Sequence, residues 1–331
     1  MMKRPSPRPV LGLVGWITVA LVCSACASSA ATVAPERIRL PMGYIPNVQY
    51  APFYVAVDRG YFLDEGIELE FDYAFETDGV ALVGAGELPF SLASGEQVLL
   101  ARAQGLPVTY FYAWWQDFPV AVAAPIESGI DTPQDLIGKS IGIPVLGGAS
   151  FIGYQALMRA AGVSPDAASL EVIGYNQVEA LLAGQTDAAV VYANNEPIQL
   201  EQLGMPVSVV RVADYVTLSS NGLITNEGTL QSDPELVRGM SRALSRGIDD
   251  VLADPDAAFE VCKRYIEGLG DGDPSVQRRV LDASIEFWRS ERAGWSDPQA
   301  WENMQQVLLN MGLLTEPLDA SLAFTNQFIN P

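Results

Sequence analysis

The sequence predicts an α/β fold in which two similar units are followed by a helical tail. Two observations predict it. Short apolar strands alternate with helices twice along the chain, and this order is typical of mostly parallel sheets covered by helices. After residue 222 the alternation stops and the remaining segments are helical. A chain of 331 residues is long enough for two domains of ordinary size.

The first unit is expected to begin at residue 37 with a strand that precedes an apolar helix. Residues 67–73, with the sequence IELEFDY, alternate between apolar and acidic side chains, which predicts a half-buried strand. The expected strands of this unit are residues 37–42, 67–73, 89–92, 108–113 and 120–124. Its expected helices are residues 50–59, 78–86 and 96–105.

The second unit follows the same order of elements without repeating the sequence of the first. A glycine-rich turn at residues 146–149 is expected to open a helix that ends at residue 161. The other expected elements are strands 140–144, 170–173, 188–192 and 207–210, with helices 177–183 and 196–203. Each helix of the tail begins at or near a proline, as helix N-termini often do. These helices are expected at residues 234–252, 255–266, 274–288 and 298–310.

The composition of the chain excludes several classes of function. The formal net charge of -21 repels nucleic acid and anionic lipid, so we expect no nucleic-acid partner. The chain contains no histidine, which excludes Ser-His-Asp and Cys-His catalysis and removes the commonest metal ligand. Its three cysteines are too few and too widely spaced for a thiolate metal site or a disulfide framework. We therefore expect a binding protein without a metal or cofactor rather than an enzyme.

The N-terminus is expected to direct the chain out of the cytoplasm. Lys3, Arg4 and Arg8 precede an apolar stretch at residues 10–22, which is too short for a comfortable membrane-spanning helix. Ser24, Ala25 and Cys26 follow and resemble a bacterial lipoprotein signal, although Cys23 replaces its usual leucine. This pattern predicts a signal peptide at residues 1–25, lipidation of Cys26 and a flexible tether at residues 26–36. The alternative is a plain secreted protein cleaved near residue 25 or 27.

Three segments of the chain resemble one known family. They are YIPNVQYAPFYVAVDRGYFLDEGIELEF at residues 44–71, DTPQDLIGKSIGIP at residues 131–144 and LLAGQTDAAVVYANNEP at residues 181–197. They are similar to the opening segment, the entry to the second lobe and the ligand loop of periplasmic-binding-protein-like proteins of the SsuA/THI5 (NMT1) type. The resemblance covers most of residues 37–331.

The resemblance implies a type II periplasmic-binding-protein fold, with two lobes joined by a hinge of two crossing strands. Lobe 1 is then expected at residues 37–122 plus 221–331, and lobe 2 at residues 123–220, with crossings near residues 120–125 and 217–225. It also implies that the protein closes over a small molecule and delivers it to an ABC permease. We expect a monomer, because a two-lobe protein that closes on its ligand needs no partner subunit. The expected location is the extracytoplasmic face of the cell membrane, with the lipid anchor as the membrane contact.

Part of this family is enzymatic in eukaryotes and makes the thiamine pyrimidine from its own histidine, with a cysteine-rich loop. The present chain has no histidine, and its glycine-rich loop at residues 146–153, LGGASFIG, contains no cysteine. The resemblance therefore implies the binding function and not this chemistry.

The loops that follow the strands are expected to face the ligand, because ligands of open α/β sheets bind outside the carboxyl ends of the strands. These loops are residues 43–50, 74–79, 94–97, 112–119, 145–152, 174–177, 192–196 and 219–222. None contains lysine or arginine, the usual partners of sulfonate and phosphate. A neutral or cationic ligand is favoured, although the backbone N–H groups at residues 147–150 could hold an anion. The loop acids Glu96 and Asp117 are expected to be solvated.

Aromatic side chains are frequent in the same loops, and stacking holds flat rings between them. We expect ligand contacts from Tyr44, Trp114, Trp115, Tyr175 and Tyr192. If the strand continues beyond residue 113, side-chain alternation directs only one of the two tryptophans toward the ligand. We expect three further aromatics to fill the lobe cores, namely Tyr50, Tyr112 and Phe151.

Carboxamides in the loops offer both a donor and an acceptor, which suits the edge of a pyrimidine or flavin ring. We expect such contacts from Gln97, Asn194 and Asn221. Asn47 matches a ligand-contacting asparagine of the pyrimidine-binding members of the family. The alternative role for Asn47 is to stabilise the turn after the preceding proline.

Three other loop residues complete the candidate site. Glu196 can accept a hydrogen bond from a ring N–H or an amine, or it can cap the helix that follows. Gly147 and Gly148 permit a tight turn and a close approach of the backbone to a ligand. Within the family, the resemblance implies riboflavin as the captured nutrient. A thiamine pyrimidine precursor is the alternative, and a sulfonate or other anion is a lesser one.

Overall fold

The structure is a computed structural model and describes residues 1–3, 5, 34–271 and 273–329. The predicted lipidation of Cys26 falls outside the described residues, as does most of the predicted signal peptide and tether, and these remain predictions. Among the described residues, no helix combines the length and the apolar character that crossing a bilayer requires. The chain from residue 35 onward forms one unit.

Ten strands form three sheets in this unit. The orders are β1-β2, β3-β10-β4 and β7-β6-β8-β5-β9. The strands are β1 (Glu36–Gly43), β2 (Ile67–Phe75), β3 (Ser91–Ser94), β4 (Val108–Ala113), β5 (Val120–Pro125), β6 (Ser140–Ile143), β7 (Ser169–Val172), β8 (Ala188–Tyr192), β9 (Val207–Arg211) and β10 (Asn221–Asn226). Nine of them match predicted strands to within two residues at each end. The tenth, β10, lies at the predicted second crossing.

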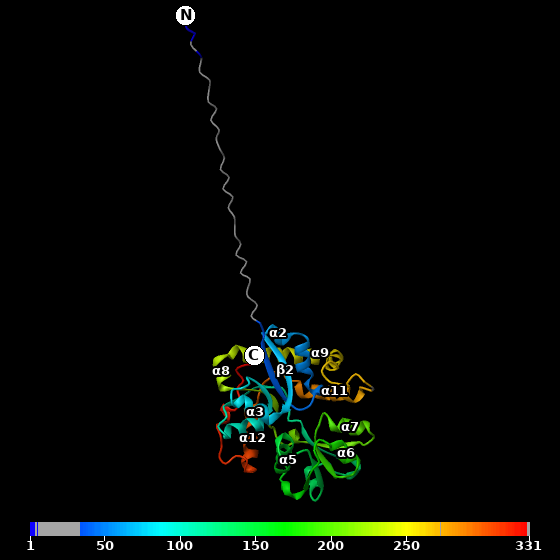
Figure 1. Cartoon of the computed structure of the whole chain (residues 1–331). Coiled ribbons are helices and arrows are strands. Elements are labelled where there is room, and N and C mark those ends of the chain that lie inside the picture. The colour runs from blue at the N-terminus through cyan, green and yellow to red at the C-terminus, as the bar shows by residue number, and fades with distance from the viewer. Residues whose placement is uncertain (4, 6–33, 272, 330–331) are drawn as a thin grey trace. The chain divides into compact units, whose positions relative to one another are not determined.

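Twelve α-helices are present in the described part of the chain. They are α1 (Ala51–Asp58), α2 (Tyr61–Asp64), α3 (Glu76–Gly84), α4 (Gly95–Ala103), α5 (Gly148–Ala160), α6 (Gln177–Leu182), α7 (Glu196–Gln202), α8 (Glu227–Ser232), α9 (Pro234–Ala253), α10 (Pro255–Cys262), α11 (Ser275–Trp288) and α12 (Pro298–Asn310). In Figure 1, α5, α6 and α7 lie on the five-stranded sheet, while α9 packs along α1.

The prolines of the tail mark helix starts for a local reason. Asp233, Asp254 and Asp297 precede Pro234, Pro255 and Pro298, and each aspartate side chain accepts a hydrogen bond from a backbone N–H of the first turn. An aspartate cap followed by proline satisfies one orphan N–H and removes another, so the helix begins there. Two short helices, α2 and α8, were not predicted, because each is too short to show a helical repeat of apolar residues.

Two strands run against their neighbours. β5 is antiparallel to both β8 and β9, and β10 is antiparallel to both β3 and β4, whereas β1–β2, β6–β7 and β6–β8 are parallel pairs. The chain passes into the five-stranded sheet through residues 114–119 and leaves it through residues 212–220. β5 and β10 are therefore the strands that follow the two crossings. The lobe boundaries at residues 122 and 220 stay a prediction.

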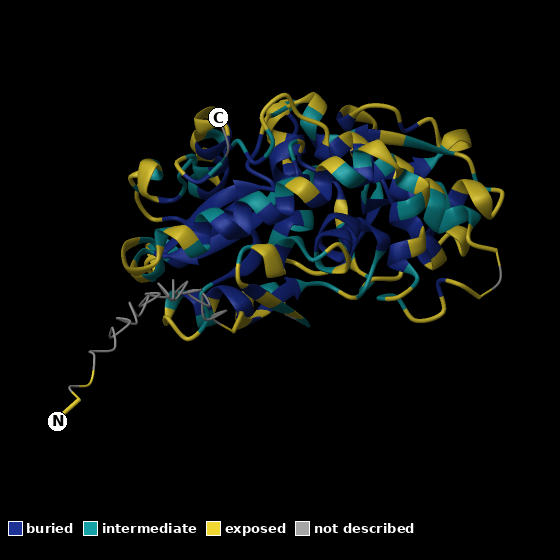
Figure 2. Ribbon diagram, turned by 90° about the horizontal axis from the view of Figure 1, so that it is seen from above, coloured by how far each residue is buried: buried dark blue, intermediate teal, exposed yellow. Residues whose placement is uncertain are grey.

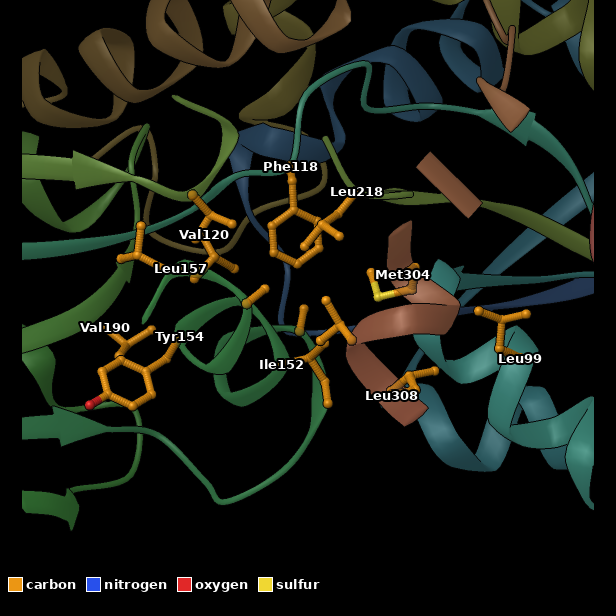
Figure 3. Packing of buried hydrophobic residues seen from close by; sticks show 14 of the residues in the cluster. Leu99, Phe118, Val120, Ile152, Tyr154, Leu157, Val190, Leu218, Met304 and Leu308 are labelled. Carbon is orange, nitrogen blue, oxygen red and sulfur yellow. The ribbon is translucent and has the colours of Figure 1, made fainter. Parts of the chain in front are cut away.

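Buried apolar side chains join the sheets and helices into continuous cores. One core contains Phe118 and Val120 at the first crossing, Ile152 of α5 and Met304 of α12. Figure 3 shows these side chains together with Leu99 of α4, so α4, α5 and α12 meet here. A second core lies under α1, α9, α10 and α11. Figure 2 shows the buried residues running through the interior, with exposed residues on the outer turns.

Cys262 lies in the second core and is fully buried. Burial raises the pKa of this thiol to about 12. At pH 8 such a thiol is ionised in only about one molecule in ten thousand, and the thiolate is the reactive form. We expect a maleimide to leave Cys262 unmodified in the native protein and to modify it in denaturant, as measured by peptide mass mapping. Rapid native modification would contradict this burial.

Candidate functional site

A cavity of about 350 Å³ lies where the strand ends of the three sheets converge. Most of the residues that line it lie at or after the carboxyl ends of strands, as is usual for open α/β sheets, whereas Asn221 begins the antiparallel strand β10. All eight loops that were expected to face a ligand contribute to this lining. The lining residues are Met42, Gly43, Tyr44, Gln49, Tyr50, Phe75, Glu76, Thr77, Leu92, Ala93, Gln97, Trp114, Trp115, Pro144, Val145, Gly147, Gly148, Ala149, Ser150, Tyr175, Gln177, Tyr192, Asn195, Glu196 and Asn221.

One wall of the cavity is a stack of aromatic rings. Trp114 lies parallel to Tyr50, with ring centroids 5.3 Å apart and an interplanar angle of 20°. Trp115 meets Trp114 edge to face at 5.4 Å and Tyr192 at 6.0 Å. Because β4 ends at Ala113, strand alternation does not apply beyond it and both tryptophans line the cavity. Tyr50 also lines it and is at the same time buried in the second core, as expected.

The other two aromatics of the core prediction lie away from the cavity. Tyr112 is fully buried, and its hydroxyl lies within hydrogen-bonding distance, 2.9 Å, of Ser245 Oγ. Phe151 packs partly buried against the first core. Neither residue is part of the cavity lining.

Tyr44 and Tyr175 meet across the cavity from different sheets. Tyr44 follows β1 and Tyr175 follows β7, and their ring centroids are 5.6 Å apart. Burial, together with the nearby carboxyl of Glu196, raises the pKa of Tyr44 to about 12. The Tyr44 hydroxyl is therefore available as a neutral donor at physiological pH, and the pair of rings joins the two halves of the cavity wall.

A carboxyl pair closes another side of the cavity. The Ser94 backbone N–H donates to Glu76 Oε1 at 2.6 Å, and Ser94 Oγ lies 2.5 Å from both Glu76 Oε1 and Glu96 Oε1. Burial and then the charge of Glu76 raise the pKa of Glu96 to about 8, and burial also raises the pKa of Glu76. Glu96 is fully buried, so the prediction that it is solvated was wrong. Asp117 is exposed and pairs with Arg211.

Glu196 is the first residue of α7 and lines the cavity, and its side chain makes no capping hydrogen bond to the first turn of this helix. Its Oε2 accepts from the backbone N–H of Tyr192 at 2.8 Å, and its Oε1 accepts from Asn195 Nδ2 at 3.1 Å. Burial raises the pKa of this carboxyl. Of the two roles considered for Glu196, the structure places the side chain in the cavity lining, where it can accept from a ligand, and gives it no capping hydrogen bond to α7. No lysine or arginine is among the lining residues that the structure describes.

The glycine-rich turn places the first turn of α5 at the cavity. Gly148 has φ +62°, a left-handed conformation that glycine adopts without strain, whereas Gly147 is extended. A side chain at either position would meet nothing within 4 Å. The requirement for glycine is therefore conformational at Gly148, and both backbones face open space in which a ligand can approach.

Two predicted site residues lie outside the cavity lining. Asn47 Oδ1 accepts from the backbone N–H of Gln49 at 3.0 Å, which is the turn-stabilising role that was considered as the alternative. Asn194 is buried, and its Nδ2 donates to Ser284 Oγ of α11 at 2.7 Å. This bond ties the loop after β8 to the C-terminal helices. The remaining predicted residues, namely Tyr44, Gln97, Trp114, Trp115, Gly147, Gly148, Tyr175, Tyr192, Glu196 and Asn221, line the cavity.

Several lining residues were not selected from the sequence. Gln49, Gln177 and Asn195 are carboxamides in the expected loops, and Phe75, Glu76 and Thr77 follow β2. Their loop positions were a usable signal, since every one of them lies in a segment expected to face the ligand. Which side of each loop turns inward is decided by packing and not by the local sequence.

Comparison with known proteins places the chain in a family. Residues 47–258 match the family model described as NMT1/THI5 like. The chain belongs to the NMT1/THI5-like family. It is 38% identical to riboflavin-binding protein RibY of Chloroflexus aurantiacus, over 95% of this chain and 96% of that protein. It is 25% identical to a formylaminopyrimidine-binding protein of Halalkalibacterium halodurans, over 95% and 98%.

Solved structures show the fold of this NMT1/THI5-like protein. The periplasmic aliphatic sulphonate binding protein SsuA from Escherichia coli superposes with a TM-score of 0.71 at 12% identity, over 88% of this chain and 92% of that one. At this level of identity the likeness establishes the fold alone. The predicted periplasmic-binding-protein fold is confirmed, and these two relatives and this structural neighbour are named as binding proteins.

Proposed function

We propose that the protein is the extracytoplasmic ligand-binding component of an ABC importer and that its ligand is riboflavin. The observation that carries the proposal is the 38% identity to riboflavin-binding protein RibY over nearly the whole of both chains. The cavity volume of about 350 Å³ falls within the range of ligand pockets. The protein acts by binding, without catalysis and without a cofactor.

The cavity chemistry suits a flat, uncharged ring. Rings stacked on Trp114, Trp115 or Tyr192 gain about 0.5–1.5 kcal/mol per aromatic pair beyond burial. Carboxamides around them supply donors and acceptors for the ring edge, as Gln97 in the first turn of α4 and Asn221 at the start of β10 do. Ligand contacts from both lobes stabilise the closed form of the protein, and the permease recognises this closed form.

The remaining parts of the proposal concern placement in the cell. The N-terminal pattern supports export and lipidation at Cys26, which anchors the protein to the outer face of the cell membrane. The tether of small and polar residues then leaves the binding unit free to reach the permease. The protein works as a monomer, because closure of a two-lobe unit needs no partner subunit.

A thiamine pyrimidine precursor is the second candidate. Glu196 favours it, since a carboxylate in the cavity can accept a hydrogen bond from the exocyclic amine of an aminopyrimidine. The 25% identity to a formylaminopyrimidine-binding protein is consistent with this candidate.

Fluorescence titration of the unlipidated protein with riboflavin tests the proposal. We expect flavin emission to be quenched on stacking and to saturate at one ligand per protein. A thermal shift with the aminopyrimidine and no flavin response would instead assign the second candidate. No response to either compound would refute both ligands.

A further inference from the structure

Three of the helices that begin at the cavity have a buried or half-buried glutamate in their first turn. These are Glu76 of α3, Glu96 of α4 and Glu196 of α7. A helix N-terminus bears partial positive charge and free N–H groups, which attract anions. Here the protein's own carboxylates stand beside these helix starts, and they accept from N–H groups at the ends of strands, Glu76 from Ser94 at the end of β3 and Glu196 from Tyr192 at the end of β8.

The contacts around Ser94 also require a proton. Its hydroxyl has one hydrogen, yet Ser94 Oγ lies 2.5 Å from an oxygen of both Glu76 and Glu96. Two carboxylates cannot both accept that hydrogen, so one carboxyl must be protonated and donate to Ser94 Oγ. Glu96 is fully buried, with its second oxygen unpartnered, whereas Glu76 lines the cavity. The proton therefore resides on Glu96, and the negative charge resides on Glu76.

We propose that the Glu76–Ser94–Glu96 cluster selects against phosphorylated ligands, so that the protein binds riboflavin and rejects riboflavin 5′-phosphate. This inference rests on the proposed function for its choice of ligand. In a cavity of about 350 Å³, a phosphate lies within a Debye length, about 10 Å, of Glu76 and Glu196. At a separation of about 7 Å, with a protein dielectric of about 20 and screening over a Debye length of about 10 Å, each carboxylate lowers the affinity for one phosphate charge by roughly tenfold, and the two together by roughly 100-fold.

The N-terminus of α5 favours an anion at the cavity lining. Its residues Gly148, Ala149 and Ser150 line the cavity, and the first turn of α5 contains no acid. The partial charge of about +0.5 at a helix N-terminus is smaller than the full charge on Glu76 alone. With Glu196 added, the carboxylates outweigh it, and the cavity retains a net preference for a neutral ligand.

Binding of riboflavin and of riboflavin 5′-phosphate, compared in four proteins, tests the cluster. In the parent protein we expect roughly 100-fold tighter binding of riboflavin. Glu96→Gln alone should leave this ratio within about twofold, because a protonated carboxyl is already neutral. In the double variant Glu76→Gln/Glu96→Gln, the ratio of the affinity for riboflavin to the affinity for riboflavin 5′-phosphate should be about tenfold lower than in the parent protein. Asp78→Asn is the matched control, since Asp78 is exposed in the same first turn of α3 and does not line the cavity.

Equal binding of the two flavins by the parent protein, or an unchanged ratio in the double variant, would overturn the proposal. If neither flavin binds, the proposed function fails, and the same comparison is made with an aminopyrimidine and its phosphate ester. If the parent protein prefers the neutral pyrimidine to its phosphate ester and the double variant has lost this preference, then selection by charge is upheld although the ligand is not riboflavin.

The pH dependence of the melting temperature, measured without ligand, tests whether Glu96 carries the proton of the Glu76–Ser94–Glu96 cluster. Burial raises the pKa of Glu96 to about 8, so its protonated form stabilises the fold below pH 4.5 and that stabilisation is lost as pH rises to about 8. Glu76, Tyr50, Tyr192 and Glu196 are the other titratable groups at this side of the cavity, and all remain in Glu96→Gln. The melting temperature of the parent should therefore fall relative to Glu96→Gln between pH 5 and 8. A difference independent of pH would refute the shared proton.

Discussion

Replacing Tyr192 by alanine is expected to weaken riboflavin binding by about 30-fold or more. Tyr192 ends β8, lines the cavity and contacts the edge of Trp115. Aromatic anchors of this kind contribute about 2 kcal/mol or more when truncated, and 1.4 kcal/mol is a factor of ten in affinity. Fluorescence quenching measures the loss. Tyr215→Ala is the control, because this exposed tyrosine lies outside the cavity lining.

The neighbouring tryptophan requires a milder substitution. Trp115 is only 2% exposed and also packs against Phe287 of α11. Trp115→Ala would cost about 3–5 kcal/mol of stability, and its binding loss could then reflect unfolding. Trp115→Phe retains an aromatic ring, and we expect reduced affinity with a folded far-UV spectrum. Unchanged affinity in both Tyr192→Ala and Trp115→Phe would remove these two residues from the site.

The largest effect on stability is expected from Gly247→Ala, at about 2–3 kcal/mol less free energy of unfolding. Gly247 lies inside α9 where this helix crosses α1. A Cβ there would overlap the Pro52 carbonyl oxygen and stand 2.9 Å from Ala56 Cβ. Two helix backbones must separate to admit it, so the clash exceeds the gain of about 1 kcal/mol from the helix propensity of alanine. Urea denaturation measures the difference.

Gly239→Ala provides the matched control in the same helix. The added Cβ would meet only Glu65, with its nearest contact at 3.1 Å from Glu65 Cβ, and a shift of a few tenths of an ångström relieves it without separating two helix backbones. Its better helix propensity offsets this adjustment, and we expect a change below about 1 kcal/mol. Equal destabilisation by the two substitutions would show that the close approach of α9 to α1 is not the cause.

Most elements of the fold could be predicted because they are encoded by local patterns. Apolar alternation at residues 67–73 and the Asp-Pro starts of α9, α10 and α12 depend only on neighbouring residues. The directions of β5 and β10 could not be predicted in this way. Each of these strands pairs with strands that are distant in sequence, so its partners and its direction are decided only when the whole chain folds.

For the candidate site, the sequence by itself determined the loops, their aromatic content and the lack of lysine and arginine in them. These properties follow from composition and from the rule that strand ends face the ligand. Only the tertiary structure decided that Asn47 stabilises a turn, that Asn194 reaches Ser284, and that Glu96 is buried against Ser94. The physical reason is that burial, pKa and side-chain direction depend on groups brought together from distant parts of the chain.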